Sequence, residues 1–323
     1  MIRGFLNEGG RLKAVEGASE LSENLVWIDL INPTDAEEND LESRLGIDIP
    51  TKEEMEEIEI SSRLYNKDGA AFMTATLPAQ ADGDDPQMHP VTFVLSGVRL
   101  ITVRYHDPRA FQTFPQRAEK VPMGCDTGEG VLVALLEAIV DRLADILERA
   151  GREIDGISRD VFQHKGAKPT KSQDFQKVLE AIGRKGDLTS NIRDSLVTLE
   201  RLIGFLGHGA MQRKSGKDLR ERIKTLSRDV RSLADHASFL SQKITFLLDA
   251  TLGMINIEQN AIIKIFSVAA VVFLPPTLVA SSYGMNFEHM PELEWLLGYP
   301  WAIGLMILSA IIPYVYFKRR GWL

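Results

Sequence analysis

A row of uncharged residues recurs near the C-terminal end of this sequence, at intervals that an α-helix places on one face. The steps are three, four or seven residues, and the members are Asn260, Ile263, Ala270, Leu274, Thr277, Ser281 and Gly284. Amide and hydroxyl oxygens can hold a strongly hydrated cation through its water shell, and they still release it easily. Several copies of this face around an axis would form a narrow neutral tube, closed by dewetting at its apolar rings. The alternative is that the small residues only permit close helix packing in lipid.

Two apolar stretches lie in this part of the sequence, and each is long enough to cross a membrane. The first includes the middle of the row, and the second follows the row. The first runs from about Ile265 to Ser282 and the second from about Leu296 to Phe317, near the roughly 20 residues that a spanning helix needs. No Lys or Arg occurs between Lys264 and Lys318. We therefore predict a hairpin of two transmembrane helices.

The charges that flank the two stretches predict their orientation. Lys264 precedes the first, and Lys318-Arg319-Arg320 follows the second. By the positive-inside rule, both chain ends then lie in the cytoplasm, and the connecting loop lies outside. An acidic outer loop would attract cations, and the membrane potential would draw them inward. The loop glutamates are Glu288, Glu292 and Glu294. The alternative is a plain membrane anchor with a hydrated loop.

A 3.5-residue apolar repeat precedes the first stretch and predicts a long packed helix. Its members follow one another at steps of three and four: Leu219, Ile223, Leu226, Val230, Leu233, Ala237, Leu240, Ile244, Leu247, Thr251 and Met254. Such a repeat specifies a seam that packs against other helices. We predict one continuous helix from Asp218 to about Ser282. The seam could pack within one subunit or between subunits.

The rest of the chain predicts an α/β domain followed by helices. Residues 1–127 contain β-branched and aromatic runs typical of strands, at 25–30, 71–77, 92–95 and 100–105. Residues 128–217 predict long amphipathic helices over 131–154 and 175–206. Gly204, Gly207 and Gly209 are expected to interrupt the second of these helices.

Composition excludes several classes of function. The net charge of -8 and the lack of a visible basic stripe argue against nucleic-acid binding. Cys125 is the only cysteine, so no disulfide can form within the chain. The sequence shows no nucleophile-base spacing, zinc-type histidine pair or nucleotide-binding fingerprint. We therefore expect neither an enzyme nor an ATP-driven pump, and no organic cofactor.

The residues after the first stretch resemble the CorA family of magnesium and cobalt transporters, and most closely its proteobacterial branch. The resemblance is carried by Tyr283-Gly284-Met285-Asn286, the following segment 287–293 and the terminal Lys-Arg-Arg-Gly-Trp-Leu. It extends back through 273–280 and 257–260, and more loosely to Trp27-Ile28-Asp29-Leu30.

This resemblance implies a funnel-shaped homopentamer in the bacterial inner membrane. Its fold class is an α+β N-terminal cytoplasmic domain, then long helices and a C-terminal two-helix transmembrane hairpin. The long helix would line the pore, and the second span would form an outer ring in the membrane lipid. The implied regions are 1–127, 128–217, 218–282 with its span at about 265–282, an outer loop 283–295, a second span 296–317 and a basic tail 318–323.

The resemblance also implies roles for individual residues. Gly284, Met285 and Asn286 would form the outer mouth, with Asn286 as the first contact of hydrated Mg2+. The implied pore lining is Asn260, Ile263, Phe266, Leu274, Thr277 and Ser281. Of these, Phe266 is not a member of the row described above and is assigned by the resemblance alone. Asp249 matches a helix aspartate that helps to hold a regulatory ion in some members.

The implied activity is a potential-driven influx of Mg2+ that also admits Co2+ and Ni2+. Mg2+ held between cytoplasmic domains would favour the closed state. Two alternatives remain open at this point. One is a zinc transporter of the related ZntB type, and the other is a membrane-tethered coiled coil that transports nothing.

Overall fold

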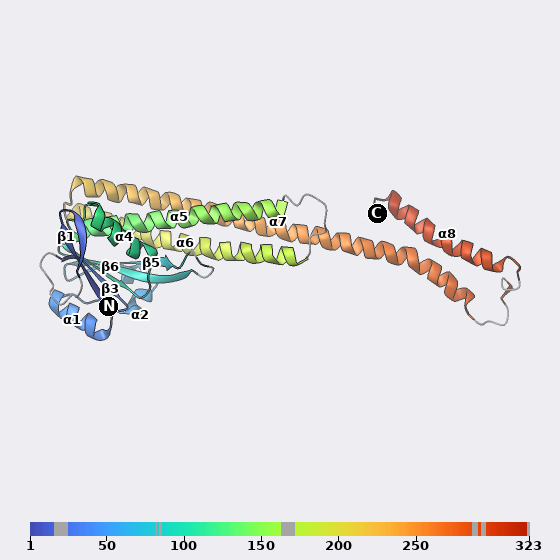
Figure 1. Cartoon of the computed structure of the whole chain (residues 1–323), viewed down its shortest axis with the longest axis horizontal. Coiled ribbons are helices and arrows are strands. Elements are labelled where there is room, and N and C mark those ends of the chain that lie inside the picture. The colour runs from blue at the N-terminus through green and yellow to red at the C-terminus, as the bar shows by residue number, and fades with distance from the viewer. Residues whose placement is uncertain are drawn as a thin grey trace. The chain divides into compact units, whose positions relative to one another are not determined.

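The chain divides into two compact units, which share one long helix. The computed structural model describes residues 1–15, 25–81, 83, 86–162, 172–285, 290–291 and 295–321 (Figure 1). One unit is Met1–Leu248 and the other is Asp249–Leu323. Helix α7, Lys217–Tyr283, contributes its N-terminal part to the first unit and its C-terminal part to the second.

The first unit is built on a mixed sheet, with seven strands among the described residues. Their order across the sheet is β2-β1-β3-β7-β6-β5-β4. Only β3 and β7 pair in parallel, while the other neighbours are antiparallel. The bounds are β1 Ile2–Glu8, β2 Arg11–Val15, β3 Leu25–Ile31, β4 Leu64–Lys67, β5 Ala70–Ala79, β6 Gln87–Ser96 and β7 Arg99–Arg104.

Helices cover both faces of this sheet, because its central strands are apolar on both sides. Neighbouring residues of a strand point to opposite faces, so Trp27 joins one core and Ile28 the other. The core around Ile28 is closed by α1, Asp35–Leu45, and α2, Lys52–Glu56. Helix α4, Arg109–Lys120, and the longer helices cover the opposite face (Figure 1). The short α3, Ile60–Arg63, leads into β4.

The first unit also contains the long helices α5, Gly128–Phe162, and α6, Ser172–Gln212. The expected interruption at Gly204, Gly207 and Gly209 is wrong, because α6 continues through all three. Gly207 instead permits a close helix approach: a Cβ atom built on it would lie 3.4 Å from Cγ2 of Ile223 on α7.

The seam of α7 packs within the chain in this unit. Val230, Leu240 and Leu247 are almost fully buried, and they belong to one core with α5 and α6 side chains such as Leu143 and Leu202. The alternative left open by the sequence is thus decided for this part of α7. Its apolar repeat stabilises one subunit rather than joining two.

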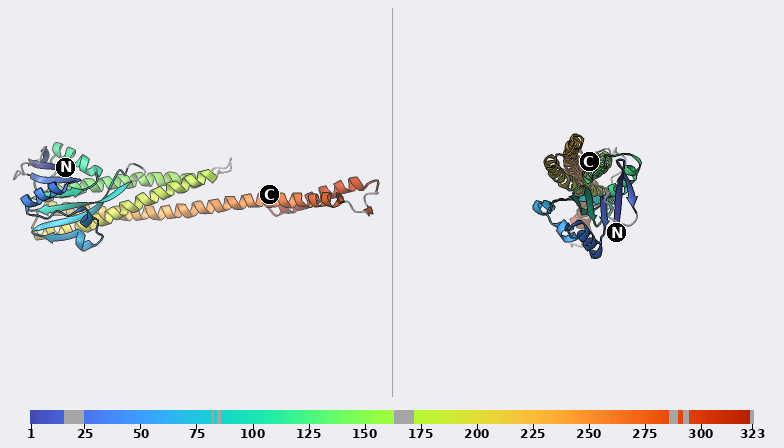
Figure 2. Two further views of the ribbon diagram at one scale, coloured as in Figure 1. Left: turned by 90° about the horizontal axis from the view of Figure 1, so that it is seen from below. Right: turned by 90° about the vertical axis from the view of Figure 1, so that its left-hand side faces the viewer.

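The second unit contains the two helices that could span a membrane. The C-terminal part of α7 and helix α8, Gly298–Arg319, are long and apolar enough among the described residues. The chain reverses direction between them (Figures 1 and 2). The expected fold class is confirmed for one chain: an α/β N-terminal domain, then long helices and two candidate spans.

Candidate ion pathway in the membrane helices

One face of α7 in the second unit is covered. Val268 is only 5% exposed, and Val272, Pro275, Val279 and Tyr283 are half-buried. These positions recur at steps of three and four and therefore lie on one helical face. The other long helix described in this unit is α8, whose Ala302 is also buried. We infer that this face of α7 packs against α8.

The uncharged row predicted from the sequence lies on the other face. Thr277 follows Val268 by about 2.5 helical turns, which places it on the opposite side of the helix. The row's other members from Ile263 to Ser281 cluster around Thr277, and all of them are exposed. Leu274 is 65% exposed although it is apolar. In the single chain, α8 does not cover this face.

Phe266 and Asn260 differ in how they relate to this face. Phe266 precedes Thr277 by about three full turns, and it is 72% exposed. It therefore lies on the row, although the spacing drawn from the sequence omitted it. Asn260 is exposed, but it stands to one side of the other members.

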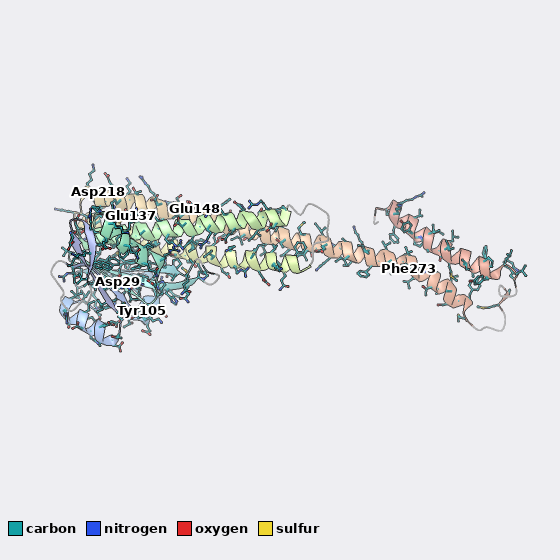
Figure 3. The ribbon with its side chains drawn as sticks, viewed as in Figure 1. Asp29, Tyr105, Glu137, Glu148, Asp218 and Phe273 are labelled. Carbon is teal, nitrogen blue, oxygen red and sulfur yellow. The ribbon has the colours of Figure 1, made fainter. Side chains whose placement is uncertain are left out.

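Thr277 presents acceptor oxygen to its surroundings. Its Oγ1 donates a hydrogen bond to the Phe273 carbonyl oxygen, at 2.8 Å, so its one proton is used and its lone pairs remain for a donor. Pro275 and Pro276 have no N–H, and the carbonyls four residues before them, at Val271 and Val272, therefore lack their usual helical donor. Figure 3 shows Phe273 on this part of α7. This segment is rich in acceptors and has no charge.

Helix α7 ends at Tyr283, immediately before the predicted outer mouth. The Gly284 amide donates to the Ala280 carbonyl oxygen at 3.0 Å, and a Cβ atom on Gly284 would lie 3.3 Å from that oxygen. Met285 follows and is half exposed. The other predicted residues of the mouth and loop lie outside the described residues: Asn286, Glu288, Glu292 and Glu294.

A cavity of 660 Å³ lies between the end of α7 and α8. Its lining is mostly apolar and includes Leu278, Val279 and Met285 from one side and Leu305 of α8 from the other. Ser281 and Ser282 add hydroxyl groups, and the described residues contribute no carboxylate to this lining. This lining does not resemble a binding site for a bare divalent cation, which needs several oxygen ligands.

Asp249, the predicted regulatory ligand, is exposed on α7. Among the described residues, no group of three or more His, Cys, Asp or Glu side chains could hold a metal ion. Asp249 thus has no such set of co-ligands in the described part of one chain. A site that used it would need groups from outside this set, such as those of a neighbouring copy.

A buried ion pair in the sheet was not predicted from the sequence. Arg104 at the end of β7 donates from Nη2 to Oδ2 of Asp29 on β3, at 2.9 Å, and both side chains are almost completely buried. The Thr102 hydroxyl also donates to Asp29, at 2.7 Å, and accepts from Nε1 of Trp27. The sequence signal for this pair was Asp29 within an otherwise apolar strand, because a buried carboxylate needs hydrogen-bond or charged partners.

Comparison with known proteins identifies the family. A family model described as CorA-like Mg2+ transporter protein matches residues 22–319. The chain belongs to this family. The magnesium transport protein CorA of Escherichia coli is 39% identical over 325 residues, and the match covers both chains in full. Members of the CorA family are ion transporters rather than enzymes, and the two apolar helices fit a membrane protein.

Solved structures match the fold. The CorA magnesium transporter from Methanocaldococcus jannaschii has a TM-score of 0.80 at 20% identity, over 100% of this chain and 99% of that chain. The ZntB cytoplasmic domain from Vibrio parahaemolyticus has a TM-score of 0.57 at 10% identity, over 79% of this chain and 97% of that chain. Identities this low establish a shared fold alone.

Proposed function

We propose that copies of this chain form a pore through which the membrane potential drives Mg2+ into the cell, and that Co2+ and Ni2+ also pass. The pore is a homopentamer in the bacterial inner membrane, with both termini of each chain in the cytoplasm. One observation carries this proposal: the uncharged row of α7 is exposed on the face that α8 leaves uncovered. Apolar side chains such as Phe266 and Leu274 are then covered by neighbouring copies around an axis.

The chemistry of this face suits an ion that keeps its water. The hydration shell of Mg2+ turns its hydrogen atoms outward, so the surrounding wall must accept hydrogen bonds. Thr277 can do so because its own proton is donated to Phe273, and the amide oxygens of Asn260 and Asn286 can do the same. Mg2+ gives up its water reluctantly, and a wall of neutral acceptors does not require it to.

The driving force comes from the membrane rather than from a chemical reaction. A divalent ion that crosses 100 mV gains about 4.6 kcal/mol, twice the roughly 2.3 kcal/mol of a single charge. Glu288, Glu292 and Glu294 at the outer mouth raise the local concentration of cations. Gly284, Met285 and Asn286 receive the hydrated ion there, and Ser281 follows along the row.

Closure is proposed to come from the apolar rings and from cytoplasmic Mg2+. Rings of Ile263, Phe266 and Leu274 exclude water when they are narrow, and this stops a hydrated ion. Mg2+ bound near Asp249 between neighbouring copies favours the narrow state, because it binds that state more tightly than the wide one. Loss of this ion shifts the population toward conduction.

The proposal is tested by ion uptake into liposomes that contain the purified full-length protein. A Mg2+-sensitive dye inside the vesicles reports influx under an inside-negative potential. The Asn286→Ala variant should lose most of this influx. The Asn39→Ala variant, altered on the exposed surface of α1, should retain it, and native mass spectrometry should find five copies.

Other outcomes would favour the alternatives. Uptake of Zn2+ in preference to Mg2+, with a rate that follows the proton gradient, would indicate a ZntB-type transporter. Equal Mg2+ influx in the Asn286→Ala variant and the parent, or a monomeric particle, would refute the proposed pore. If the parent protein admits neither Mg2+ nor Zn2+, the tethered coiled coil is the alternative that remains.

A further inference from the structure

A cleft of 900 Å³ lies between α6 and α7 in the Met1–Leu248 unit. Its apolar lining includes Ile203 and Ala210 of α6 and Ile223 of α7, all of them buried. Gly204 and Gly207 also line it and leave space there, and His208 and Met211 of α6 add their side chains to the lining. This volume is within the roughly 300–1,000 Å³ typical of small-molecule sites.

Four basic side chains stand along the α7 side of the cleft. Lys217, Arg220, Lys224 and Arg228 all line it and are exposed, and their steps of three and four place them on one helical face. A single carboxylate, that of Glu221, also lines the cleft. The lining therefore carries a formal excess of three positive charges, in a chain whose net charge is -8.

These cations are poorly neutralised by the protein. The Lys217 ammonium is 3.9 Å from a Glu221 oxygen, and both side chains are largely exposed, so this pair contributes little. In the part of the chain that the structure describes, no carboxylate forms an ion pair with Arg220, Lys224 or Arg228. The i,i+4 spacings among these three residues put like charges beside each other, which destabilises a helix. A bound anion would relieve that repulsion.

Two basic residues just outside the cleft are paired. Arg222 donates to both oxygens of Glu137 on α5, at 2.9 and 2.7 Å, and Glu137 is labelled in Figure 3. Arg213 donates to Glu129 at 2.7 Å. These two arginines are therefore neutralised, unlike the cations that line the cleft. We expected no basic stripe from the sequence, where these residues alternate with acidic ones, but the turn of the helix separates them.

We propose that this cleft binds a nucleoside triphosphate. Its phosphates would lie against the basic face of α7, and its base and ribose would cover the apolar lining beside Gly204. The basic face is about 16 Å long at 1.5 Å per residue, so a triphosphate meets two or three of the cations at once. Arg side chains suit this role because the guanidinium group binds phosphate oxygens in pairs.

The first test is binding to the full-length protein in detergent micelles, measured by isothermal titration calorimetry in EDTA. ATP should bind, inorganic tripolyphosphate should bind more weakly, and adenosine alone should not bind detectably. The ATP affinity should fall as salt is raised, because the contacts are exposed and charged. Equal affinities for ATP and tripolyphosphate would contradict the part of the proposal that places the base on the apolar lining.

The second test fills the cleft. A Cβ atom on Gly204 would meet nothing within 4 Å, so Gly204→Phe can occupy the space without a backbone clash. The variant should bind ATP at least about tenfold more weakly, since a tenfold change needs only ~1.4 kcal/mol of lost contact. Gly183→Phe is the matched control: it lies in the same helix with equally open surroundings and does not line the cleft.

A charge variant keeps the proposal testable if Gly204→Phe misfolds. Arg228→Gln should weaken ATP binding about two- to fivefold, the range of one exposed ion pair. Arg231→Gln removes a similar exposed charge from the same helix outside the cleft and should leave binding unchanged. The absence of ATP binding by the parent protein, or equal binding by both Arg variants, would overturn the proposal.

One further result would assign the cleft to a different occupant. If the parent protein binds no ATP and Gly204→Phe changes the number of copies in the particle, the cleft is a contact between copies. Binding is measured here without transport. A failure to bind ATP therefore does not bear on the proposed pore.

Discussion

The buried pair of Asp29 and Arg104 makes a strong prediction about stability. Both side chains are no more than 2% exposed, and Arg104 also donates to the His106 carbonyl oxygen and to Asp107. Burial lowers the pKa of Arg104, but the hydrogen bonds and charges of Asp29 and Asp107 outweigh it and raise the pKa overall. The guanidinium therefore stays charged. In Asp29→Asn it would remain buried without its main counter-charge.

The expected cost is large because the remaining charge cannot reach water. Removal of one partner from a buried pair typically costs about 3–5 kcal/mol. For a domain of 150–250 residues, each kcal/mol lowers the unfolding midpoint by roughly 2–4 °C. We therefore expect Asp29→Asn to unfold about 6–20 °C below the parent protein. In Figure 3, Asp29 lies in the sheet of the first unit.

The assay is thermal unfolding of the full-length protein in detergent, followed by circular dichroism at a fixed salt concentration. Lys13→Gln provides the control, because Lys13 and its partner Glu8 are both exposed and such pairs contribute little to stability. The double variant Asp29→Leu with Arg104→Met should recover much of the loss, since it leaves no buried charge. A decrease below about 2 °C in Asp29→Asn would show that water or a rearrangement already compensates Arg104.

Three further predictions concern pH, packing and gating. Burial lowers the pKa of His106 to about 4, so the folded protein binds its proton less readily than the unfolded chain. The neutral His106 therefore contributes about 3 kcal/mol to the free energy of unfolding above pH 6.5, and this contribution is lost as the pH falls toward 4. The unfolding midpoint should vary less with pH across this window in His106→Gln than in the parent protein. A Cβ atom on Gly128 would lie 2.3 Å from backbone atoms of Arg99 and Leu100, so Gly128→Ala should cost about 1–3 kcal/mol. By contrast, a Cβ atom on Gly183 would meet nothing within 4 Å, so Gly183→Ala should stabilise α6 by up to about 1 kcal/mol. An unfolding midpoint that falls equally in Gly128→Ala and Gly183→Ala would contradict this reasoning. Leu274→Ser should admit water to the proposed apolar ring and raise dye-reported Mg2+ influx about fivefold or more. Leu278→Ser, which lies in the cavity beside α8, should leave the influx unchanged. Equal influx in the two variants would contradict gating by dewetting.

Strong periodic patterns made much of the fold predictable from the sequence. The apolar repeat and the uncharged stretch after it predicted a helix over 218–282, and α7 extends one residue further at each end. The central strands β5, β6 and β7 were anticipated because they are apolar over most of their length. The strands β1, β2 and β4 were missed. β2 and β4 are short, polar edge strands, and β1 is partly exposed, so each gives a weak hydrophobic signal.

The candidate site was predictable in its chemistry but not in its surroundings. Spacing alone placed Thr277 and Leu274 on one face, but only the buried Val268 shows that the opposite face is the covered one. The basic cleft escaped notice because Asp218 and Glu221 stand between its cations in the sequence. Similarly, the contact between Asp29 and Arg104 depends on the parallel pairing of β3 with β7, which no local pattern specifies.

The apolar repeat of α7 is satisfied by α5 and α6 of the same chain, and this affects how the protein is made. A newly synthesised chain can complete its first unit, Met1–Leu248, without waiting for another copy. The apolar repeat of that unit is then already buried when the hydrophobic C-terminal hairpin is synthesised. The proposed oligomerisation can follow as a separate event, and residues other than the buried repeat would then decide which copies come together.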